Sequence, residues 1–171
     1  GLALICVSAA GENQIVVAPG ANRELTSAGV ALPEADALIC QLEVPVTTLL
    51  DLVATFPGSV CINLAPAADV PDELLDSADV LVVNQTEAEY YGERLHRSGV
   101  LVVETYGAAG ASIFRDGEKI AAANAPTIDA VDTTGAGDCF TAALTVAIAE
   151  GKAPQAALEF APDARPVGYA S

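Results

Sequence analysis

The sequence has no methionine or tryptophan, one histidine, and only 7 lysine and arginine residues against 23 aspartate and glutamate residues. The formal net charge of −16 gives the chain no electrostatic attraction for polyanions such as nucleic acid or an anionic membrane surface. Long apolar runs are also missing, and none approaches the roughly 20 residues that a helix needs to span a bilayer. We therefore expect neither nucleic-acid binding nor membrane insertion.

The four cysteines form no Cys-x-x-Cys pair, and the single histidine, His96, lies on a polar stretch. Zinc sites combine closely spaced cysteine and histidine ligands, so a zinc site is not expected. Cys6, Cys40 and Cys61 lie within apolar, strand-like runs, which predicts buried free thiols. Free thiols are typical of a reducing compartment, and we expect a cytoplasmic protein.

What the sequence does contain is a regular alternation of short apolar runs with helix-like segments. Near-continuous apolar strands that alternate with helices are typical of a parallel sheet with helices on both faces, a three-layer α/β/α fold. The expected core strands are 37–42, 60–64, 79–83 and 100–105, and the expected helices are 46–56, one beginning near 71, 86–97, 136–150 and 155–160. The expected hairpins pair 2–8 with 14–18 and 111–115 with 118–122.

Polar side chains stand where several of these strands end. Glu43, Asn63, Asn84 with Glu87, and Thr105 each follow or close an apolar run. In open α/β sheets, ligands bind beyond the carboxyl ends of the strands. These residues are therefore candidates for a common binding site.

The most informative stretch is residues 132–140, which read Asp-Thr-Thr-Gly-Ala-Gly-Asp-Cys-Phe. Two glycines separated by a small residue let backbone N–H groups converge on an anion, and the helix that follows adds its positive end. A carboxylate inside such a cradle, Asp138, fits a base that accepts the proton of an attacking hydroxyl in phosphoryl transfer. The alternative is an ordinary first-turn helix acid, stabilised by the helix dipole. The residues by themselves do not decide between the two interpretations.

This stretch resembles the signature of the ribokinase-like sugar kinase family. Five further segments follow in the family's order: 11–13 with 19–22, 41–43, 63–67, 84–89 and 105–110. The resemblance implies a single ribokinase-like α/β domain over residues 1–171, in which residues 1–18 include strands of a small β lid. Because the family's sugar-binding motif is absent and Gly1 opens within a strand-like run, we expect further sequence before Gly1. We also expect omitted residues between Glu89 and Val100, where the family usually has a longer helical segment.

The resemblance implies a catalytic base at Asp138 and an anion hole formed by the amides of Gly135, Ala136 and Gly137. It also implies that Asn84 binds phosphate, that Glu87 holds water-coordinated Mg²⁺, and that Glu43 and Asp138 bind the sugar. Asp132 and the Thr134 carbonyl are the implied ligands of K⁺. The implied nucleotide-binding loop consists of Thr105, Tyr106, Gly107, Ala108, Ala109 and Gly110. For Glu43 and Asp132, a strand-end or turn-capping acid is the alternative.

The resemblance further implies a reaction in which the γ-phosphoryl group of ATP passes to a primary hydroxyl of a pentose, D-ribose in the first instance. A fructose or nucleoside kinase of the same family is one alternative, and a catalytically silent nucleotide- or sugar-binding module is another. The implied cofactors are Mg²⁺ and K⁺, and the implied ligands are ATP and a small sugar. The lid strands could pair two copies of the chain as a homodimer.

Overall fold

The strands of the central sheet follow one another in space in the same order as along the chain. The structure is a computed structural model that describes residues 1–7, 13–126 and 135–161. Its main sheet has the order β3-β4-β5-β6-β7-β8, in which β3 to β6 are parallel and the last two strands are antiparallel. These strands are β3 Ala37–Gln41, β4 Ser59–Asn63, β5 Val80–Asn84, β6 Leu101–Thr105, β7 Ala111–Arg115 and β8 Glu118–Ala123.

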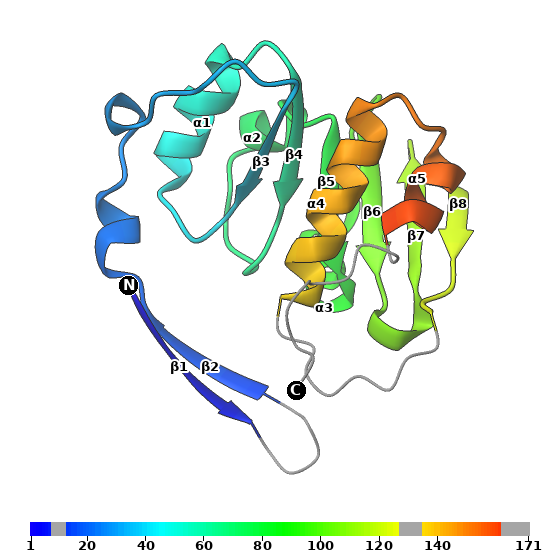
Figure 1. Ribbon diagram of the computed structural model, residues 1–171, viewed down its shortest axis with the longest axis horizontal. Helices are drawn as coiled ribbons and strands as arrows, with labels where there is room; N and C mark the ends of the chain where they lie inside the picture. Colours follow the sequence, from blue (N-terminus) through cyan, green and yellow to red (C-terminus); the bar gives the residue numbers. More distant parts are fainter. Residues whose placement is uncertain (8–12, 127–134, 162–171) are drawn as a thin grey trace.

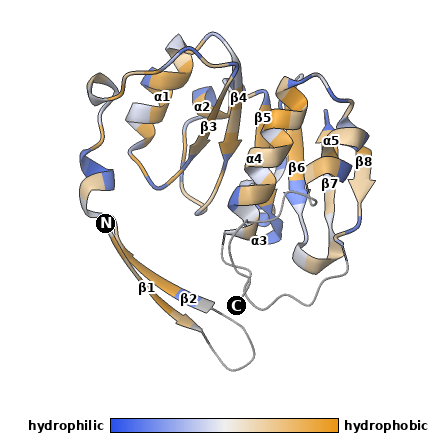
Figure 2. Ribbon diagram, in the orientation of Figure 1, coloured by the Kyte–Doolittle hydropathy of each residue, from blue (hydrophilic) through white to orange (hydrophobic). Residues whose placement is uncertain are grey.

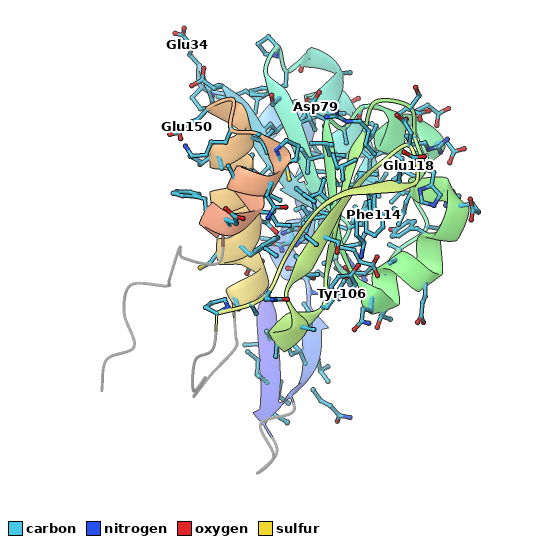
Figure 3. The ribbon with its side chains drawn as sticks, turned by 90° about the vertical axis from the view of Figure 1, so that its right-hand side faces the viewer. Glu34, Asp79, Tyr106, Phe114, Glu118 and Glu150 are labelled. Carbon is cyan, nitrogen blue, oxygen red and sulfur yellow. The ribbon has the colours of Figure 1, made fainter. Side chains whose placement is uncertain are left out.

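Helices cover both faces of this sheet, which confirms the expected three-layer architecture (Figure 1). Consecutive parallel strands require crossovers of one hand, so the connecting helices α1 Val46–Thr55, α2 Asp72–Asp76 and α3 Gln85–Tyr91 pack on one face. The opposite face carries α4 Ala136–Ala149 and α5 Pro154–Phe160. Figure 3 shows the two helical layers on either side of the sheet.

Strand β5 shows why the core strands read as continuous apolar runs. Leu81 and Val83 belong to the core cluster on the α1–α3 face, whereas Val80 and Val82 belong to the cluster under α4 and α5. Successive side chains of a strand point to opposite faces, and both faces are covered here, so all four are buried. The strand ends where burial ends, at the exposed Asn84.

Helix α3 is shorter than the sequence predicts. It stops at Tyr91 because Gly92 takes a positive φ of 52°, and a short 3₁₀ helix, Gly92–Leu95, follows. The expectation of a helix that continues to Arg97 is therefore wrong. Arg97 instead leaves the helical path and pairs with Asp72 of α2 at 2.5 Å.

The first two strands form a separate antiparallel sheet, β1 Leu2–Val7 with β2 Asn13–Ala18, as predicted. Figure 1 shows this hairpin extending away from the helices and the main sheet, on the side toward which the parallel strands point. Its residues are strongly apolar, as the orange ribbon of Figure 2 shows, yet Leu2, Leu4 and Val16 are each more than 60% exposed. Two 3₁₀ helices that the sequence did not predict, Gly20–Glu24 and Ser27–Gly29, connect the hairpin to β3.

All four cysteines are free, and Cys40 and Cys61 are buried as expected. Cys6 is exposed, which corrects the expectation for this residue, because no layer of the protein that the structure describes packs on its hairpin. None of the described helices is long and apolar enough to cross a membrane.

Candidate active site

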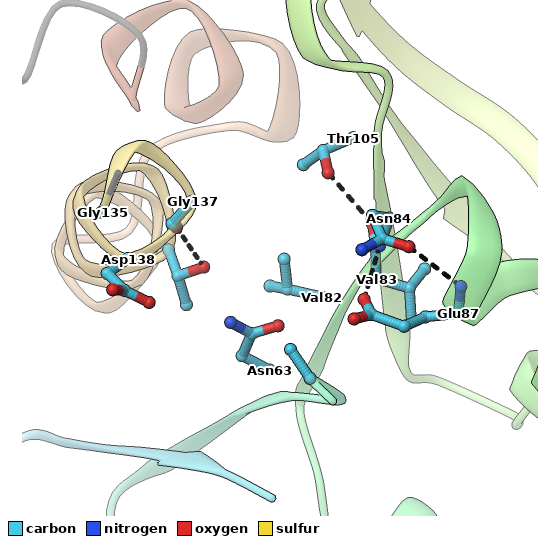
Figure 4. A pocket seen from close by; sticks show the side chains of 11 residues that line it. Asn63, Val82, Val83, Asn84, Glu87, Thr105, Gly135, Gly137 and Asp138 are labelled. Carbon is cyan, nitrogen blue, oxygen red and sulfur yellow. Dashed lines mark hydrogen bonds between the residues drawn. The ribbon is translucent and has the colours of Figure 1, made fainter. Parts of the chain in front are cut away.

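An open pocket of about 210 Å³ lies between the carboxyl ends of the parallel strands and the start of α4 (Figure 4). Its strand side is formed by residues at and beyond the ends of β4, β5 and β6, and its other side by the first turns of α4. The lining residues are Asn63, Ala65, Val82, Val83, Asn84, Glu87, Thr105, Gly135, Gly137, Asp138 and Thr141. Parallel strands end at one edge of their sheet, which is why residues far apart in sequence meet here.

The first turn of α4 provides backbone donors on one side of the pocket. Gly135 is the N-cap residue, with a left-handed φ of 75°, and its carbonyl accepts the N–H of Cys139 at 3.0 Å. The amides of Ala136, Gly137 and Asp138 precede this bond, so they take no part in the helix's own hydrogen bonding. Amides at a helix start, together with the positive end of the dipole, can hold an anion such as a phosphate.

Gly137 leaves room in this cradle. A Cβ atom at this position would meet no described atom within 4 Å, and the φ of Gly137 is not positive, so neither packing among the described residues nor backbone conformation demands glycine. The residue nevertheless lines the pocket. The close approach of a ligand to the backbone would explain why this position is glycine although the described fold does not require glycine there.

Asp138 is exposed in the same first turn and lines the pocket. Figure 4 shows it on the α4 side, with Glu87 on the opposite side. An exposed carboxylate beside a row of amides can accept a proton from a hydroxyl that is held near the anion.

Asn84 and Glu87 form the opposite wall through a reciprocal capping box at the start of α3. The N–H of Asn84 donates to Glu87 Oε2 at 2.8 Å, and Asn84 Oδ1 accepts the N–H of Glu87 at 2.9 Å. Glu87 is only 6% exposed, and burial raises the pKa of its carboxyl, an effect that the Asn84 hydrogen bond partly opposes. The fold thus keeps a buried carboxylate beside the pocket at a cost in solvation, which is common at functional sites.

The predicted nucleotide loop begins at the pocket and then turns away from it. Thr105 lines the pocket, and its hydroxyl donates to the carbonyl of Val83 at 3.3 Å. The N–H of Tyr106 bonds to the Gly110 carbonyl at 2.8 Å, which closes the loop between β6 and β7. Figure 3 shows Tyr106 at the end of the sheet opposite Asp79. The other loop residues do not line the pocket: Tyr106, Gly107, Ala108, Ala109 and Gly110.

The structure does not bring every predicted residue into this pocket. Glu43 is exposed beyond β3 and does not line it, and Ala136 is an exposed residue of α4 whose side chain also lies outside the lining. Asp132 and Thr134, the predicted K⁺ ligands, lie outside the described residues. Their roles stay predictions.

The pocket also includes Asn63, a strand-end candidate from the sequence, and Thr141, which the sequence did not single out. Asn63 ends β4, and Figure 4 shows it between Asp138 and Glu87. Thr141 is buried in α4, and its hydroxyl donates to the Gly137 carbonyl at 2.8 Å. The signal for Thr141 in the sequence was its spacing from Gly137 and Asp138, because residues three and four apart share one face of a helix.

The sequence is similar to bacterial proteins named ribokinase. It is 35% identical over 170 residues to ribokinase of Bacillus subtilis (strain 168), a match that covers 91% of this chain and 57% of the relative. It is 34% identical over 183 residues to ribokinase of Haemophilus influenzae, where the shares are 94% and 60%. The chain therefore spans less than two thirds of the length of these relatives.

Solved structures show the same fold. Ribokinase from Thermotoga maritima superposes with a TM-score of 0.81 at 31% identity, covering 97% of this chain and 63% of that one. Arabidopsis thaliana ribokinase, solved in complex with ribose and ATP, gives a TM-score of 0.74 at 29% identity and covers 94% and 60%. Residues 1–164 match the pfkB family of carbohydrate kinases. The family resemblance and fold predicted from the sequence are thus confirmed, and the chain belongs to the pfkB carbohydrate kinase family.

Proposed function

We propose that this protein is an ATP-dependent sugar kinase that transfers the γ-phosphoryl group of ATP to a primary hydroxyl of D-ribose. The observation that carries the proposal is the pocket itself, where Asp138 and the amides of the first α4 turn face Asn84 and the buried Glu87. The relatives and structural neighbours named ribokinase support ribose as the sugar, and one of those structures holds ribose and ATP.

The geometry suits a direct displacement at phosphorus. The sugar hydroxyl oxygen forms a bond to the γ-phosphorus, the bond from that phosphorus to the ADP oxygen breaks, and the hydroxyl proton passes to the Asp138 carboxylate. The amides of Gly135, Ala136 and Gly137 stabilise the charge on the transferred group as donors at a helix start, and the amide of Asp138 joins them because it too precedes the first helical hydrogen bond. Asp138 also orients the hydroxyl, and such positioning matters more than basicity in a loose transition state.

Mg²⁺ fits the residues on the strand side of the pocket, provided that it is bound through water. The described residues hold no cluster of three or more acidic, histidine or cysteine side chains that would cage a metal directly. Mg²⁺ usually keeps several waters and binds to one or two carboxylates plus substrate phosphates. Glu87 would hold such a water, and Asn84 a phosphate oxygen. When bound, the ion offsets the phosphate charge in a protein of net charge −16.

A monovalent cation belongs to the same proposal. Asp132 and the Thr134 carbonyl are oxygen donors immediately before the anion-binding turn in sequence. We expect K⁺ to raise the activity more than Na⁺ does at matched ionic strength, measured as the initial rate of phosphoryl transfer. Equal rates in the two salts would remove the cation from the proposal and leave the kinase.

The β1–β2 hairpin is proposed to pair with the same hairpin of a second copy. Both of its faces are apolar and exposed: Leu4 pairs with Val16 on one face, and Ile5 with Ile15 on the other. An isolated two-stranded sheet is marginally stable, and an exposed apolar patch marks an interaction surface. Sedimentation should therefore give a dimer that Leu4→Lys with Val16→Lys dissociates, and a monomer at all concentrations would contradict the pairing.

The transfer reaction itself is tested with the purified protein, ATP, Mg²⁺ and D-ribose, while fructose and a nucleoside serve as competing acceptors. We expect ribose phosphate and ADP to form in equal amounts, and Asp138→Asn to lower kcat by about 10²–10⁴-fold, the usual contribution of a general base. Nucleotide affinity of the variant should hold, because a negative charge near the phosphates is removed.

Three outcomes would contradict the proposal. Preferred transfer to fructose or to the nucleoside would move the assignment to another kinase of the family. Binding of ATP and ribose without transfer would favour the silent binding module. Near-normal kcat in Asp138→Asn would make that residue a helix-start acid only.

A further inference from the structure

Thr141 is a buried hydroxyl residue at the base of the anion-binding turn. Its side chain is 3% exposed and lines the pocket, and Oγ1 donates to the carbonyl oxygen of Gly137 at 2.8 Å, the bond drawn from Gly137 in Figure 4. In an α-helix this carbonyl already accepts the N–H of the residue four positions later. The hydroxyl is therefore a second donor to one oxygen, and helix formation does not require it.

The bond acts on the peptide unit between two residues that line the pocket, Gly137 and Asp138. The carbonyl of Gly137 and the N–H of Asp138 belong to the same planar peptide, so a constraint on one end fixes the direction of the other. That N–H is one of the three amides that precede the first helical hydrogen bond. The Cα atom at the end of this peptide carries the Asp138 carboxylate.

The first turn of α4 needs such a constraint because its own residues supply little. Gly135 is the N-cap residue and has no side chain with which to cap the turn, and Gly137 within the turn costs up to about 1 kcal/mol of helix stability relative to alanine. Ala136, Gly137 and Asp138 are exposed. Among the described side chains, the Thr141 hydroxyl is the one that bonds to the backbone of residues 135–138.

We propose that Thr141 is a positioning residue for phosphoryl transfer: its hydroxyl clamps the Gly137–Asp138 peptide, and thereby aligns the Asp138 amide and carboxylate with the transferred group. The inference rests on the proposed kinase function. Glycines give phosphate close access to the backbone but leave the turn conformationally free. A buried threonine one turn further along the helix fixes the orientation of the Gly137–Asp138 peptide.

Thr145 provides a matched control within the same helix. Its hydroxyl makes an equivalent bond, to the Thr141 carbonyl at 2.7 Å, and it is equally buried at 4% exposure. It does not line the pocket, and the peptide that it holds lies one turn away from Asp138. A role confined to the stability of the helix predicts no larger loss of rate for Thr141 than for Thr145.

The test compares Thr141→Val, Thr141→Ser and Thr145→Val with the unmodified protein. Valine keeps the branched shape without a donor, and serine keeps the donor. We expect Thr141→Val to lower kcat about tenfold, since small misplacements of reacting groups cost up to about 10²-fold, while KM for ribose stays within twofold. Thr141→Ser should restore most of the rate, and Thr145→Val should keep it.

A second measurement needs no turnover. Nuclear magnetic relaxation of the backbone amides should show lower order parameters for Gly137 and Asp138 in Thr141→Val and unchanged ones in Thr145→Val. Unchanged order parameters, an unchanged kcat, or equal losses in the two valine variants would each overturn the clamp. Failure of the kinase proposal is a different result, because the unmodified protein would then transfer no phosphoryl group. In that case the relaxation measurements still decide whether Thr141 orders the Gly137–Asp138 peptide.

Discussion

The phenol oxygen of Tyr91 hydrogen-bonds to both polar groups of Ala68: it donates to the carbonyl at 2.7 Å and accepts the N–H at 3.3 Å. Tyr91 is the last residue of α3 and is 2% exposed, and Ala68 lies in the connection that follows β4. One side chain thus ties the helix that carries Glu87 to the segment that begins at Asn63. These two segments form neighbouring parts of the pocket wall.

Removal of this hydroxyl should destabilise the fold. In Tyr91→Phe, the peptide groups of Ala68 lose their partner, and we expect a loss of about 1–2 kcal/mol in the free energy of unfolding, typical of buried groups left without hydrogen bonds. Urea denaturation measures the change. The control is Tyr90→Phe, because Tyr90 is 55% exposed and should stay within about 0.5 kcal/mol. Equal effects in the two variants would show that the Tyr91 bond contributes nothing specific.

Glu87 should make stability depend on pH. Burial raises the pKa of this carboxyl in the folded state, so the folded protein binds a proton more readily than the unfolded chain does. The associated stabilisation is complete below the ordinary glutamate pKa of about 4.3 and is lost as the pH rises through the raised folded value. Glu87→Gln can keep the capping box without titrating. Its stability advantage over the unmodified protein should therefore grow from acid to neutral pH and then level off.

Urea denaturation of both proteins across this pH range measures that difference. A difference independent of pH would show that Glu87 ionises equally well in the folded and unfolded states. At neutral pH the same variant should need more Mg²⁺ for half-maximal activity, because the carboxylate proposed to hold the ion's water is gone.

The cysteines should fall into two reactivity classes. Burial raises the pKa of the Cys40 thiol to about 11, and burial likewise raises that of Cys61 to about 11 although a bond to Thr145 opposes it. Thiolates are the reactive species, so neither should react with a disulfide reagent at pH 8 in the folded protein. Cys6 is exposed and Cys139 partly so, and both should react. Rapid reaction of all four before denaturant is added would contradict this burial pattern.

The sequence predicted those parts of the fold that depend on a local pattern. Apolar runs such as Val80–Val83 identify doubly covered strands because burial on both faces removes polar residues. The end of α3 was missed because Gly92 and Gly99 both suit a helix stop, and both have positive φ, so only the surrounding contacts decide which one terminates the helix. The two 3₁₀ helices before β3 carry no apolar periodicity that would reveal them.

The site residues that belong to one contiguous motif could be predicted from the sequence, whereas those that only the fold brings together could not. Asp138 and Gly137 lie in a contiguous signature, and Asn84 with Glu87 has the spacing of a capping box. Thr141 has no such signature, because its importance comes from a bond to Gly137 that only the helix creates. Glu43 follows a core strand as the other candidates do, but β3 is the edge strand of the main sheet and its end lies outside the pocket.

Gly137→Ala should have opposite effects on the stability of the fold and on the binding of the phosphate. The position is helical, and a Cβ atom there would meet no described atom within 4 Å, so the new methyl group should be accommodated without strain. Alanine is the better helix former, and we expect the free energy of unfolding to rise by about 0.5–1 kcal/mol. The methyl group would nevertheless enter the pocket beside the amides that are proposed to face the phosphate.

Activity should therefore fall while stability rises. We expect a loss of at least tenfold in kcat/KM for ATP, because even a small displacement of the phosphate from its donors weakens every interaction made in the transition state. Thermal unfolding and initial rates on the same preparation test both parts. Ala142→Gly is the matched control, since this exposed position of α4 lies outside the pocket and should lose stability without losing rate. A fully active Gly137→Ala protein would show that the phosphate does not approach this turn, and the anion hole would have to be sought elsewhere in the pocket.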